Sequence, residues 1–332
     1  MKKYISIFAI VIFIALISGC AKNNSLKTQA KVQDYFPIKE NVKYIYEGKG
    51  NEYAAYNVYI DYTSADKVQQ RINNGGTETV KVLQIKDGKL TQLISRGETY
   101  FRENYLEAAG GANEILLMEP LVKGTTWTLK DSSVRTITNN SVDITTPSGS
   151  YKAIEVTTDN SNGKTINYYA KNIGLVKVVF NSGEAEISSS LSKIEENASF
   201  IQSINFYYPD ANKNKIVYQK KEVIFKTNDI TKQVLENVYK ELIKDKAGDK
   251  FTTNTEVNSL YINKDNIVYI DLNNAFLEEI KVGALYEKMI IQSIVNTLGH
   301  YYNSDKVVLT IDNMPYESRH IAMEKGGYYK VD

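Results

Sequence analysis

The chain has 332 residues, of which 40 are basic and 39 acidic, so its formal net charge is +1. This balance provides no basic excess of the kind that binds nucleic acid. The chain contains one cysteine, which excludes a disulfide within the chain, and it is longer than one usual domain, which predicts two domains.

The N-terminus has the pattern of a secretory signal peptide. Lys2 and Lys3 form a positive start, and residues 5–17 form an apolar run without any charge. The run is shorter than the ~20 residues that a membrane-spanning helix needs. We therefore predict that residues 1–19 are a signal peptide. Its removal takes both lysines and changes the formal net charge from +1 to −1.

The apolar run ends in Ile17-Ser18-Gly19-Cys20, which resembles the lipobox of bacterial lipoprotein precursors. The resemblance implies cleavage between Gly19 and Cys20 and attachment of lipid to the thiol of Cys20. A two-chain lipid anchor holds a protein on a bilayer where a single chain binds reversibly. We therefore expect a protein that is lipid-anchored to the cell membrane on its extracytoplasmic face, with residues 20–33 as a polar tether.

Residues 34–197 show the alternation of half-buried antiparallel strands. Apolar β-branched and aromatic residues alternate with polar ones, for example in residues 56–62 and 79–85. Asp87-Gly88 predicts a tight hairpin turn because both residues accept a positive φ. The segment is therefore predicted to be an antiparallel all-β domain, either a sandwich or a barrel-like sheet.

Two stretches of this segment, residues 119–127 and 168–177, resemble parts of lipoprotein β-domains. Those domains share no common activity, so the resemblance implies a fold and no function. The single tryptophan, Trp127, lies in the first stretch. A tryptophan on an alternating strand is expected in the core rather than in a ligand site.

The chain changes character after a helix-prone stretch at residues 192–198, and a second domain is predicted at 201–332. The expected elements are, in order, strands at 204–210 and 216–226, a helix between Ile230 and Leu242, strands at 257–262 and 267–272, a helix at 283–298 that stops at Gly299, and a strand at 306–311. This β-β-α-β-β-α-β order predicts a small α+β domain with both helices on one face of a sheet.

Several stretches of the second domain resemble the GerMN domain of sporulation and spore-germination lipoproteins. They are residues 206–210, residues 268–273 with Phe276, Gly283 with Glu287, residues 291–298, and residues 307–312. The resemblance covers about 201–316 and implies a non-enzymatic module for protein assembly at a membrane. It implies a partner in the envelope or the sporulation apparatus and allows a homo-oligomer. The germination protein has two such modules in tandem and this chain has one, so the resemblance does not extend to ring formation.

The sequence predicts no catalytic residues, no metal site and no cofactor. His300 and His320 are the two histidines, and neither has a second ligand beside it at metal-site spacing. Asp271, Glu278 and Glu279 invite a glycosidase hypothesis, because two carboxylates are the minimum for that chemistry. Asp271, however, ends a strand, and the two glutamates lie in a polar loop. We therefore expect that the protein is not an enzyme.

Two tyrosine pairs, Tyr301-Tyr302 and Tyr328-Tyr329, flank the last expected strand. Tyrosine is favoured at protein interfaces, and the apolar strand at 307–311 would form an edge that either pairs with a partner or is covered within its own chain. Alternation along a strand also turns one tyrosine of each pair inward, so core packing is the competing interpretation. These four tyrosines are our candidate interaction surface.

The leading hypothesis is a membrane-anchored lipoprotein whose GerMN-like domain assembles with another envelope protein during sporulation or spore germination. One alternative is an accessory lipoprotein to a sensor kinase, or a lipoprotein whose β-domain binds a cell-wall glycan or a small molecule. An envelope hydrolase is a third hypothesis. The sequence identifies neither the partner nor the developmental stage.

Overall fold

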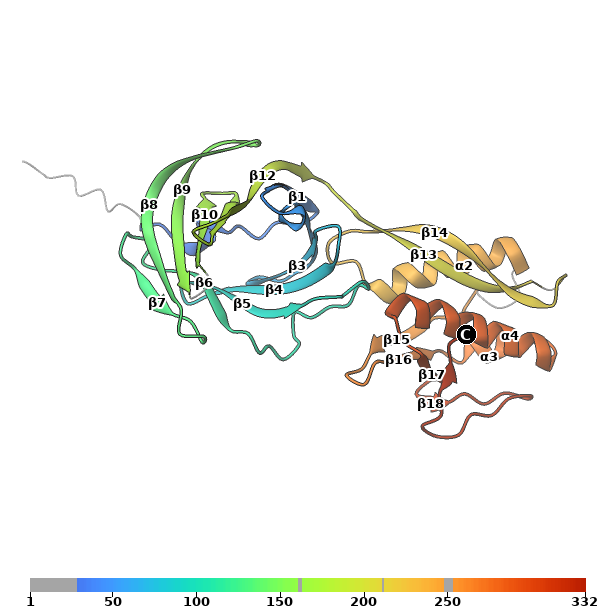
Figure 1. Ribbon diagram of the computed structural model, residues 1–332. Helices are drawn as coiled ribbons and strands as arrows, with labels where there is room; N and C mark the ends of the chain where they lie inside the picture. The colour runs from blue at the N-terminus through green and yellow to red at the C-terminus, as the bar shows by residue number, and fades with distance from the viewer. Residues whose placement is uncertain (1–28, 161–162, 211, 248–252) are drawn as a thin grey trace, which may run out of the picture.

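The structure is a computed structural model that describes residues 29–160, 163–210, 212–247 and 253–332. It has two regions, a curled β-sheet and an α+β region, which lie end to end (Figure 1). The predicted signal peptide, the cleavage position at Gly19 and the lipidation residue Cys20 lie outside the described residues. Within the described residues, no helix is long and apolar enough to span a membrane.

The first region consists of short helices and one antiparallel sheet, which has 12 strands in the described part of the chain. The elements are α1 (Val32–Tyr35), β1 (Val42–Lys49), η1 (Glu52–Ala54), β2 (Tyr56–Thr63), β3 (Lys67–Asn73), β4 (Glu78–Lys86), β5 (Lys89–Arg96), β6 (Glu114–Met118), β7 (Thr126–Thr128), β8 (Val134–Thr146), β9 (Gly149–Asn160), β10 (Gly163–Ala170), β11 (Gly174–Asn181) and β12 (Glu186–Glu196). Their order across the sheet is β6-β5-β4-β3-β2-β1-β12-β11-β10-β9-β8-β7. The first and last strands of the region therefore pair in its middle.

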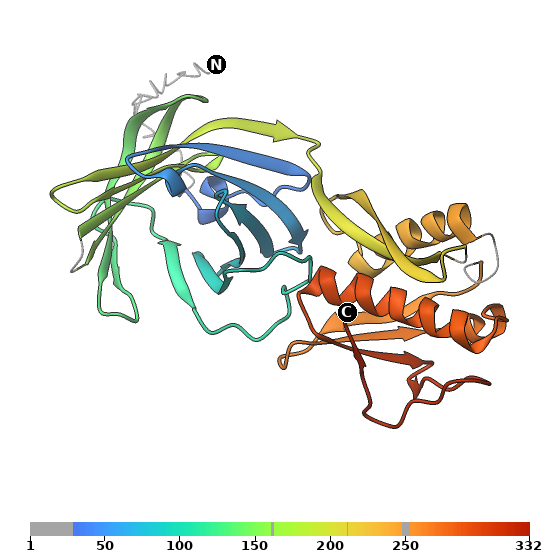
Figure 2. The same ribbon diagram turned by 45° about the vertical axis from the view of Figure 1, so that its right-hand side comes forward.

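The sheet curls until its two edge strands approach each other (Figure 2). Trp127 Nε1 of β7 donates a hydrogen bond to the carbonyl oxygen of Ile115 in β6 at 3.0 Å, and Arg135 Nη1 donates to the same oxygen at 2.6 Å. Side chains thus bridge the gap between the edges. The sheet is the curled alternative of the prediction and not a sandwich, and Trp127 is buried as expected.

Local turn signals in this region were reliable, whereas one helix signal was not. Asp87 and Gly88 have φ values of 50° and 68° and connect β4 to β5, as the sequence predicts. Residues 192–198 look helix-prone, but residues up to Glu196 belong to β12. Pairing of this end of β12 with β1 supplies hydrogen bonds that override the local preference.

The second region contains two sheets and three helices in the described residues. Its elements are β13 (Phe200–Asp210), β14 (Lys215–Phe225), α2 (Thr231–Ala247), β15 (Val257–Ile262), β16 (Ile267–Leu272), α3 (Ala275–Glu279), α4 (Ala284–Tyr302), β17 (Lys306–Ile311), β18 (Met314–Pro315) and β19 (Tyr329–Lys330). Strands β13 and β14 form a separate hairpin, and the second sheet has the order β15-β16-β17-β18 with β19 also paired to β17. The predicted order of main elements is confirmed.

The arrangement of the two long helices differs from the expectation of one sheet with both helices on one face. Helices α2 and α4 each contact the β13–β14 hairpin and also a strand of the β15–β18 sheet. Each helix thus contacts both sheets, and in Figure 1 the hairpin runs across α2 and above α4. The expectation of a single sheet was wrong, because the β13–β14 strands pair only with each other.

Strand β17 is an interior strand of its sheet. It pairs in parallel with β16 on one side and antiparallel with β18 and β19 on the other. Of the two alternatives for the edge at residues 307–311, the structure shows coverage within the chain, and Val307 and Leu309 are buried. The C-terminal strands, which are too short to be recognised by their pattern, cover this edge.

Helix α4 runs one turn further than the sequence predicts. It continues past Gly299 to Tyr302 and ends at Asn303, a left-handed residue with φ 52° and ψ 53°. The extra turn packs Tyr301 and Tyr302 into the core, which stabilises it.

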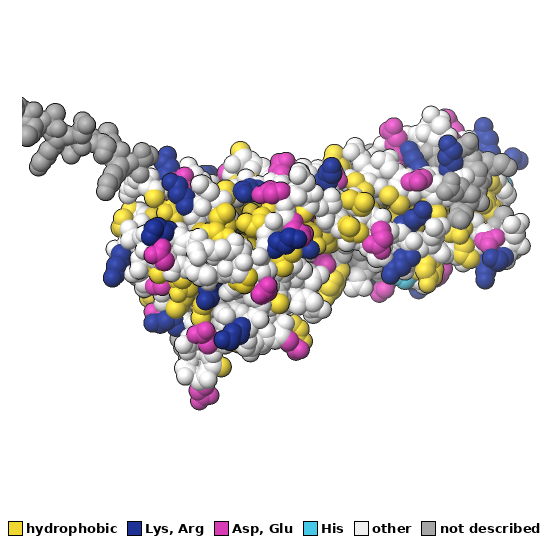
Figure 3. All heavy atoms as spheres, turned by 90° about the horizontal axis from the view of Figure 1, so that it is seen from above, with side chains coloured by type: hydrophobic (Ala, Val, Ile, Leu, Met, Phe, Trp, Pro, Cys, Tyr) yellow, Lys and Arg dark blue, Asp and Glu magenta, His cyan; other side chains and the backbone are white. Residues whose placement is uncertain are grey.

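On the surface, acidic and basic side chains are interspersed over the face seen in Figure 3, and neither sign forms a continuous patch there.

Candidate functional site

The junction between the two regions is built around a buried arginine. Arg102 lies in the segment between β5 and β6, and its side chain is fully buried. Its Nη2 atom donates to the carbonyl oxygens of Asp61 at 2.7 Å and Lys226 at 2.9 Å. Its Nη1 atom donates to Tyr62 Oη at 2.9 Å and to the carbonyl oxygen of Asp229. One guanidinium group thus joins the curled sheet to the start of α2.

A second buried arginine supports the same junction. Arg71 Nη2 lies 2.9 Å from Asp61 Oδ2, and Arg71 Nη1 donates to Glu78 Oε2 at 2.8 Å. Burial opposes the charged form, but Asp61 and Glu78 outweigh it and raise the pKa of Arg71. The guanidinium also lies 4.9 Å from the ring centre of Phe200, the first residue of β13. Paired and hydrogen-bonded in this way, the buried charges are tolerated.

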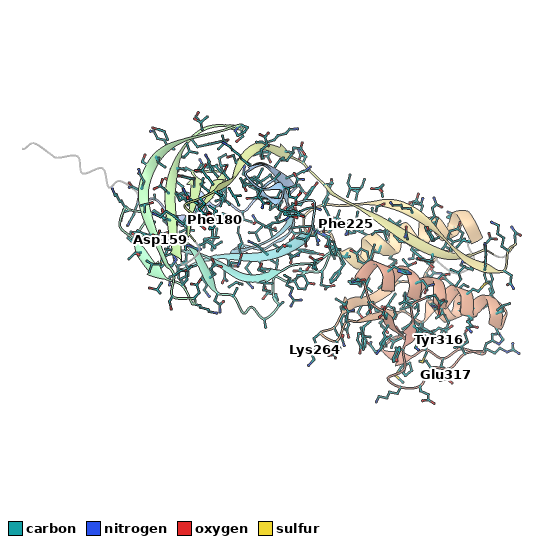
Figure 4. All side chains as sticks on the ribbon, viewed as in Figure 1. Asp159, Phe180, Phe225, Lys264, Tyr316 and Glu317 are labelled. Atoms are coloured by element: carbon teal, nitrogen blue, oxygen red, sulfur yellow. The ribbon has the colours of Figure 1, made fainter. Side chains whose placement is uncertain are left out.

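Tyr301 and Tyr302 belong to this junction. The backbone N–H of Arg102 donates to Tyr301 Oη at 2.9 Å, and the ring of Tyr302 lies 5.1 Å from that of Phe101. Both tyrosines are buried, so they are core residues rather than an exposed interaction surface. In Figure 4, Phe225 marks the place where the two regions meet. Burial also raises the pKa of Glu103, beside Arg102, to about 7.

The other tyrosine pair divides as alternation requires. Tyr329 pairs with Val307 and is half-buried, so it faces inward. Tyr328 is 40% exposed, and Lys306 Nζ lies 4.8 Å from its ring centre. Tyr328 thus remains a surface residue, whereas its neighbour packs against the core.

Tyr328 lies against Lys306, which shares with Val308 the face of β17 that points away from the core and α4. Tyr261 and Tyr269 are cross-strand partners there with rings stacked at 5.1 Å, and Val308 is the partner of Tyr269 on the next strand. Tyr261 is 44% exposed. We call Tyr261, Tyr269, Val308 and Tyr328 the outer tyrosine face. Sequence analysis missed Tyr261 and Tyr269, although their positions in two alternating strands on either side of one hairpin turn would have paired them.

A different kind of site lies inside the curled sheet. A cavity of about 450 Å³ is lined by side chains from β1 to β6, β8 and β10 to β12, and by the segment after α1. The stacked rings of Tyr46 and Tyr56, with centres 4.5 Å apart, form part of its wall, as does Tyr169. Its size falls within the range of about 300–1,000 Å³ found for small-molecule sites.

The polar groups of the cavity wall are unevenly paired. Arg135 donates to Glu114 Oε1, Thr158 Oγ1 and the carbonyl oxygen of Ile115 at 2.6–2.8 Å, so its guanidinium is fully engaged. Lys81 has no hydrogen bond or ion pair with any described residue. Burial, opposed in part by Glu114, lowers the pKa of Lys81. The cavity wall therefore holds a cation that no described residue neutralises at contact distance.

The carboxylates considered for glycosidase chemistry have structural partners. Asp271 is buried and accepts hydrogen bonds from Thr310 Oγ1 at 2.6 Å and from the N–H of Asn313 at 2.7 Å. Glu279 accepts from the N–H groups of residues 254 and 255, and Glu278 accepts from Asn274. Each carboxylate thus ties a loop or helix end in place.

The two histidines lie apart from any cluster of metal ligands. The ring of His300 stacks on Tyr207 with centres 5.2 Å apart, and its Nε2 lies 3.1 Å from the carbonyl oxygen of Asp332. His320 is exposed. Within the described residues no three His, Cys, Asp or Glu side chains gather as a metal site would require.

Comparison with known families agrees with the fold of the second region. Residues 205–317 match the family model Germane, described as "Sporulation and spore germination". The match lies within the predicted second domain and confirms the resemblance inferred from its motifs. The α+β region is therefore a GerMN-like domain. No curated protein matches the chain by sequence.

Solved structures resemble parts of the chain. The tandem GerMN domains of the sporulation protein GerM from Bacillus subtilis are 23% identical, with 36% of this chain and 41% of that chain covered and a TM-score of 0.27. A lipoprotein from Parabacteroides distasonis is 14% identical over 48% of this chain and 98% of its own, with a TM-score of 0.29. An exported protein with a YmcC-like fold from Bacteroides fragilis is 12% identical, with the same coverage and a TM-score of 0.27.

Proposed function

We propose that this chain is an exported lipoprotein, anchored to the membrane through Cys20, whose GerMN-like domain assembles with a protein partner during sporulation or spore germination. The observation that carries the proposal is the match of residues 205–317 to a family described by that process. The lipobox-like Ile17-Ser18-Gly19-Cys20 supports the anchor.

The outer tyrosine face is the part of the domain best suited to bind a partner. Its rings are exposed or half-buried and lie on a sheet whose opposite side is packed on α4, so the surface is held rigid. Tyrosine binds partners at low entropic cost because few rotatable bonds must be fixed. Lys306 and Lys330 flank this face and form no ion pair among the described residues, which favours a partner with acidic side chains.

Photocrosslinking in sporulating cells tests this surface. p-Benzoylphenylalanine is placed at Tyr261 or Tyr328 and, as a matched control, at Tyr53, which is 54% exposed on the curled sheet. We expect one envelope protein to be captured from the first two positions and not from Tyr53. The double variant Tyr261→Ala with Tyr328→Ala should lose the complex in pull-down and lower the yield of heat-resistant spores. Capture of a second copy of this chain would identify a homo-oligomer, and equal capture from all three positions would refute the docking surface.

The anchor is tested separately. Cys20→Ser should leave an unprocessed precursor or release the protein from membranes, because the chain has no other thiol for the lipid. Membrane fractionation with metabolic labelling by radioactive palmitate measures both. Unchanged labelling and retention of the variant would refute the lipid anchor at Cys20.

A further inference from the structure

The cavity of the curled sheet has polar side chains in its wall, which a core formed only by apolar packing would not need. The same strands bury a well-packed apolar cluster elsewhere along their length, with Leu90, Leu117 and Ile137 fully buried. Around the cavity, however, inward positions carry glutamine, asparagine, lysine and tyrosine, for example Gln70 and Asn167. These two side chains are half-buried and make no side-chain hydrogen bond within the described residues, so their amide groups are available to water or a ligand.

The charges of the wall indicate the sign of such a ligand. Arg135 and Glu114 neutralise each other at 2.8 Å, and Lys39 at the rim lies 3.5 Å from the exposed Glu196. Lys81 is the remaining charged group of the wall, with no partner in the described residues. One uncompensated positive charge matches one negative charge on the ligand. A carboxylate has that charge, whereas a phosphate monoester carries −1.5 to −2 at neutral pH.

The remaining wall indicates the body of the ligand. Tyr46, Tyr56 and Tyr169 present ring surface, and Val58, Ile60 and Leu83 present aliphatic surface. Such a wall favours a ligand whose uncharged part is aromatic or aliphatic, because rings stack on rings and aliphatic groups pack against apolar surface. Gln70 and Asn167, which make no side-chain hydrogen bond within the described residues, add amide donors and acceptors across the cavity.

We propose that the cavity inside the curled sheet binds a small carboxylic acid with an aromatic or aliphatic body, that Lys81 binds its carboxylate, and that the Tyr46–Tyr56–Tyr169 wall packs on its body. This inference goes beyond the proposed assembly function and stands on a different region. Failure of the ligand proposal would therefore not affect the proposed docking surface, and failure of the docking surface would not affect the ligand proposal.

Isothermal titration calorimetry with matched acids and amides tests the proposal. The purified chain from residue 20 onward, with Cys20→Ser to remove the lipid attachment, is titrated with 4-phenylbutyrate and octanoate and with the corresponding amides, which keep the body and lack the charge. A charge-assisted hydrogen bond favours the acid by about tenfold or more in Kd. We expect at least one acid to bind with that preference over its amide.

Two variants assign the preference to Lys81. Lys81→Met keeps the length of the side chain and removes the charge, and it should abolish the preference for the acid. Lys152→Met, on the exposed outer part of β9, should retain it. If Lys81→Met does not fold by circular dichroism, Lys81→Gln provides the same test. Equal binding of acids and amides by the unaltered cavity, an undiminished acid preference in the Lys81 variant, or no binding of either acid at millimolar concentration would overturn the proposal.

Discussion

The two regions of this chain use their interiors in opposite ways. The curled sheet holds a cavity of about 450 Å³ with polar and charged groups in its wall, whereas a cavity lined only by the α+β region, between α2 and the β15–β16 strands, holds about 80 Å³ and has a mostly apolar wall. In the α+β region the tyrosines without a packing role lie on the outside, as in Tyr261 and Tyr328. This difference underlies our two proposals, a ligand site inside the first region and a partner surface on the outside of the second. The two proposals can be tested separately as long as the junction between the regions is left intact.

The largest expected effect comes from breaking the junction. Arg102→Met removes the guanidinium's hydrogen bonds to the carbonyl oxygens of Asp61 and Lys226 and to the hydroxyl of Tyr62, and so unlinks the curled sheet from the start of α2. We expect a loss of about 3 kcal/mol or more in the free energy of unfolding, and two urea transitions in place of one. Arg96→Met is the matched control, because Arg96 is exposed and contacts one ring, that of Tyr105. A single unshifted transition for Arg102→Met would show that the regions do not depend on this residue.

The pH dependence of stability gives the next largest effect. Burial raises the pKa of Glu103 from 4.5 to about 7, so the folded state favours the neutral acid. The associated stability is complete below about pH 4.5 and is lost as the pH rises toward 7. The loss is up to about 3 kcal/mol, before allowance for partial solvent access. Glu103→Gln should remove this slope in urea titrations between pH 4.5 and 7; a slope that is unchanged in the variant would exclude Glu103 as its source.

Replacing Lys81 in the cavity wall is expected to have a smaller effect on the free energy of unfolding, and to raise it rather than lower it. Lys81→Met replaces an unpaired cation in a largely buried position by an apolar side chain of similar length. We expect the free energy of unfolding at pH 7 to rise by about 1 kcal/mol, as is common when a polar group held for binding is replaced. Chemical denaturation measures this change. A destabilised Lys81→Met protein would mean that the lysine is part of the packing, and the two interiors would then be less different than proposed.

The smallest effect is expected on the outer tyrosine face. Tyr328→Ala removes an exposed ring and one contact with Lys306, which should change the free energy of unfolding by less than about 1 kcal/mol. Tyr302→Ala, in the buried junction, should cost about 3 kcal/mol or more. Thermal denaturation of the two variants side by side tests the division of the four predicted tyrosines into surface and core. Similar losses for both would contradict it.

Local signals allowed much of the fold to be predicted. Hairpins at Asp87-Gly88 and at residues 263–266 and both long helices follow from patterns only a few residues long. The GerMN-like domain followed from its motifs. The pairing of β1 with β12 and the separation of the β13–β14 hairpin could not be predicted, since they depend on contacts between distant parts of the chain.

The functional residues were harder to predict for the same reason. Arg102 lies in an irregular segment, and its sequence neighbours do not indicate that its guanidinium meets carbonyl oxygens more than a hundred residues away along the chain. Lys81 occupies an ordinary polar position of an alternating strand, and only the curl of the sheet turns that side toward a cavity rather than solvent. Tyr301 and Tyr302 resemble exposed aromatic residues until the junction covers them.

The pairing of β1 with β12 also sets an order of events in folding. β1 pairs Val42 with Glu196 and Lys49 with Ser188, so one of its edges stays without its partner until most of the region has been synthesised. Until then Tyr44 and Tyr46 lie on a strand with an unpaired edge, and a strand of another chain can pair with that edge. Because the pairing of β1 with β12 is non-local, it forms late, and the chain has to be kept from aggregating until this edge is paired.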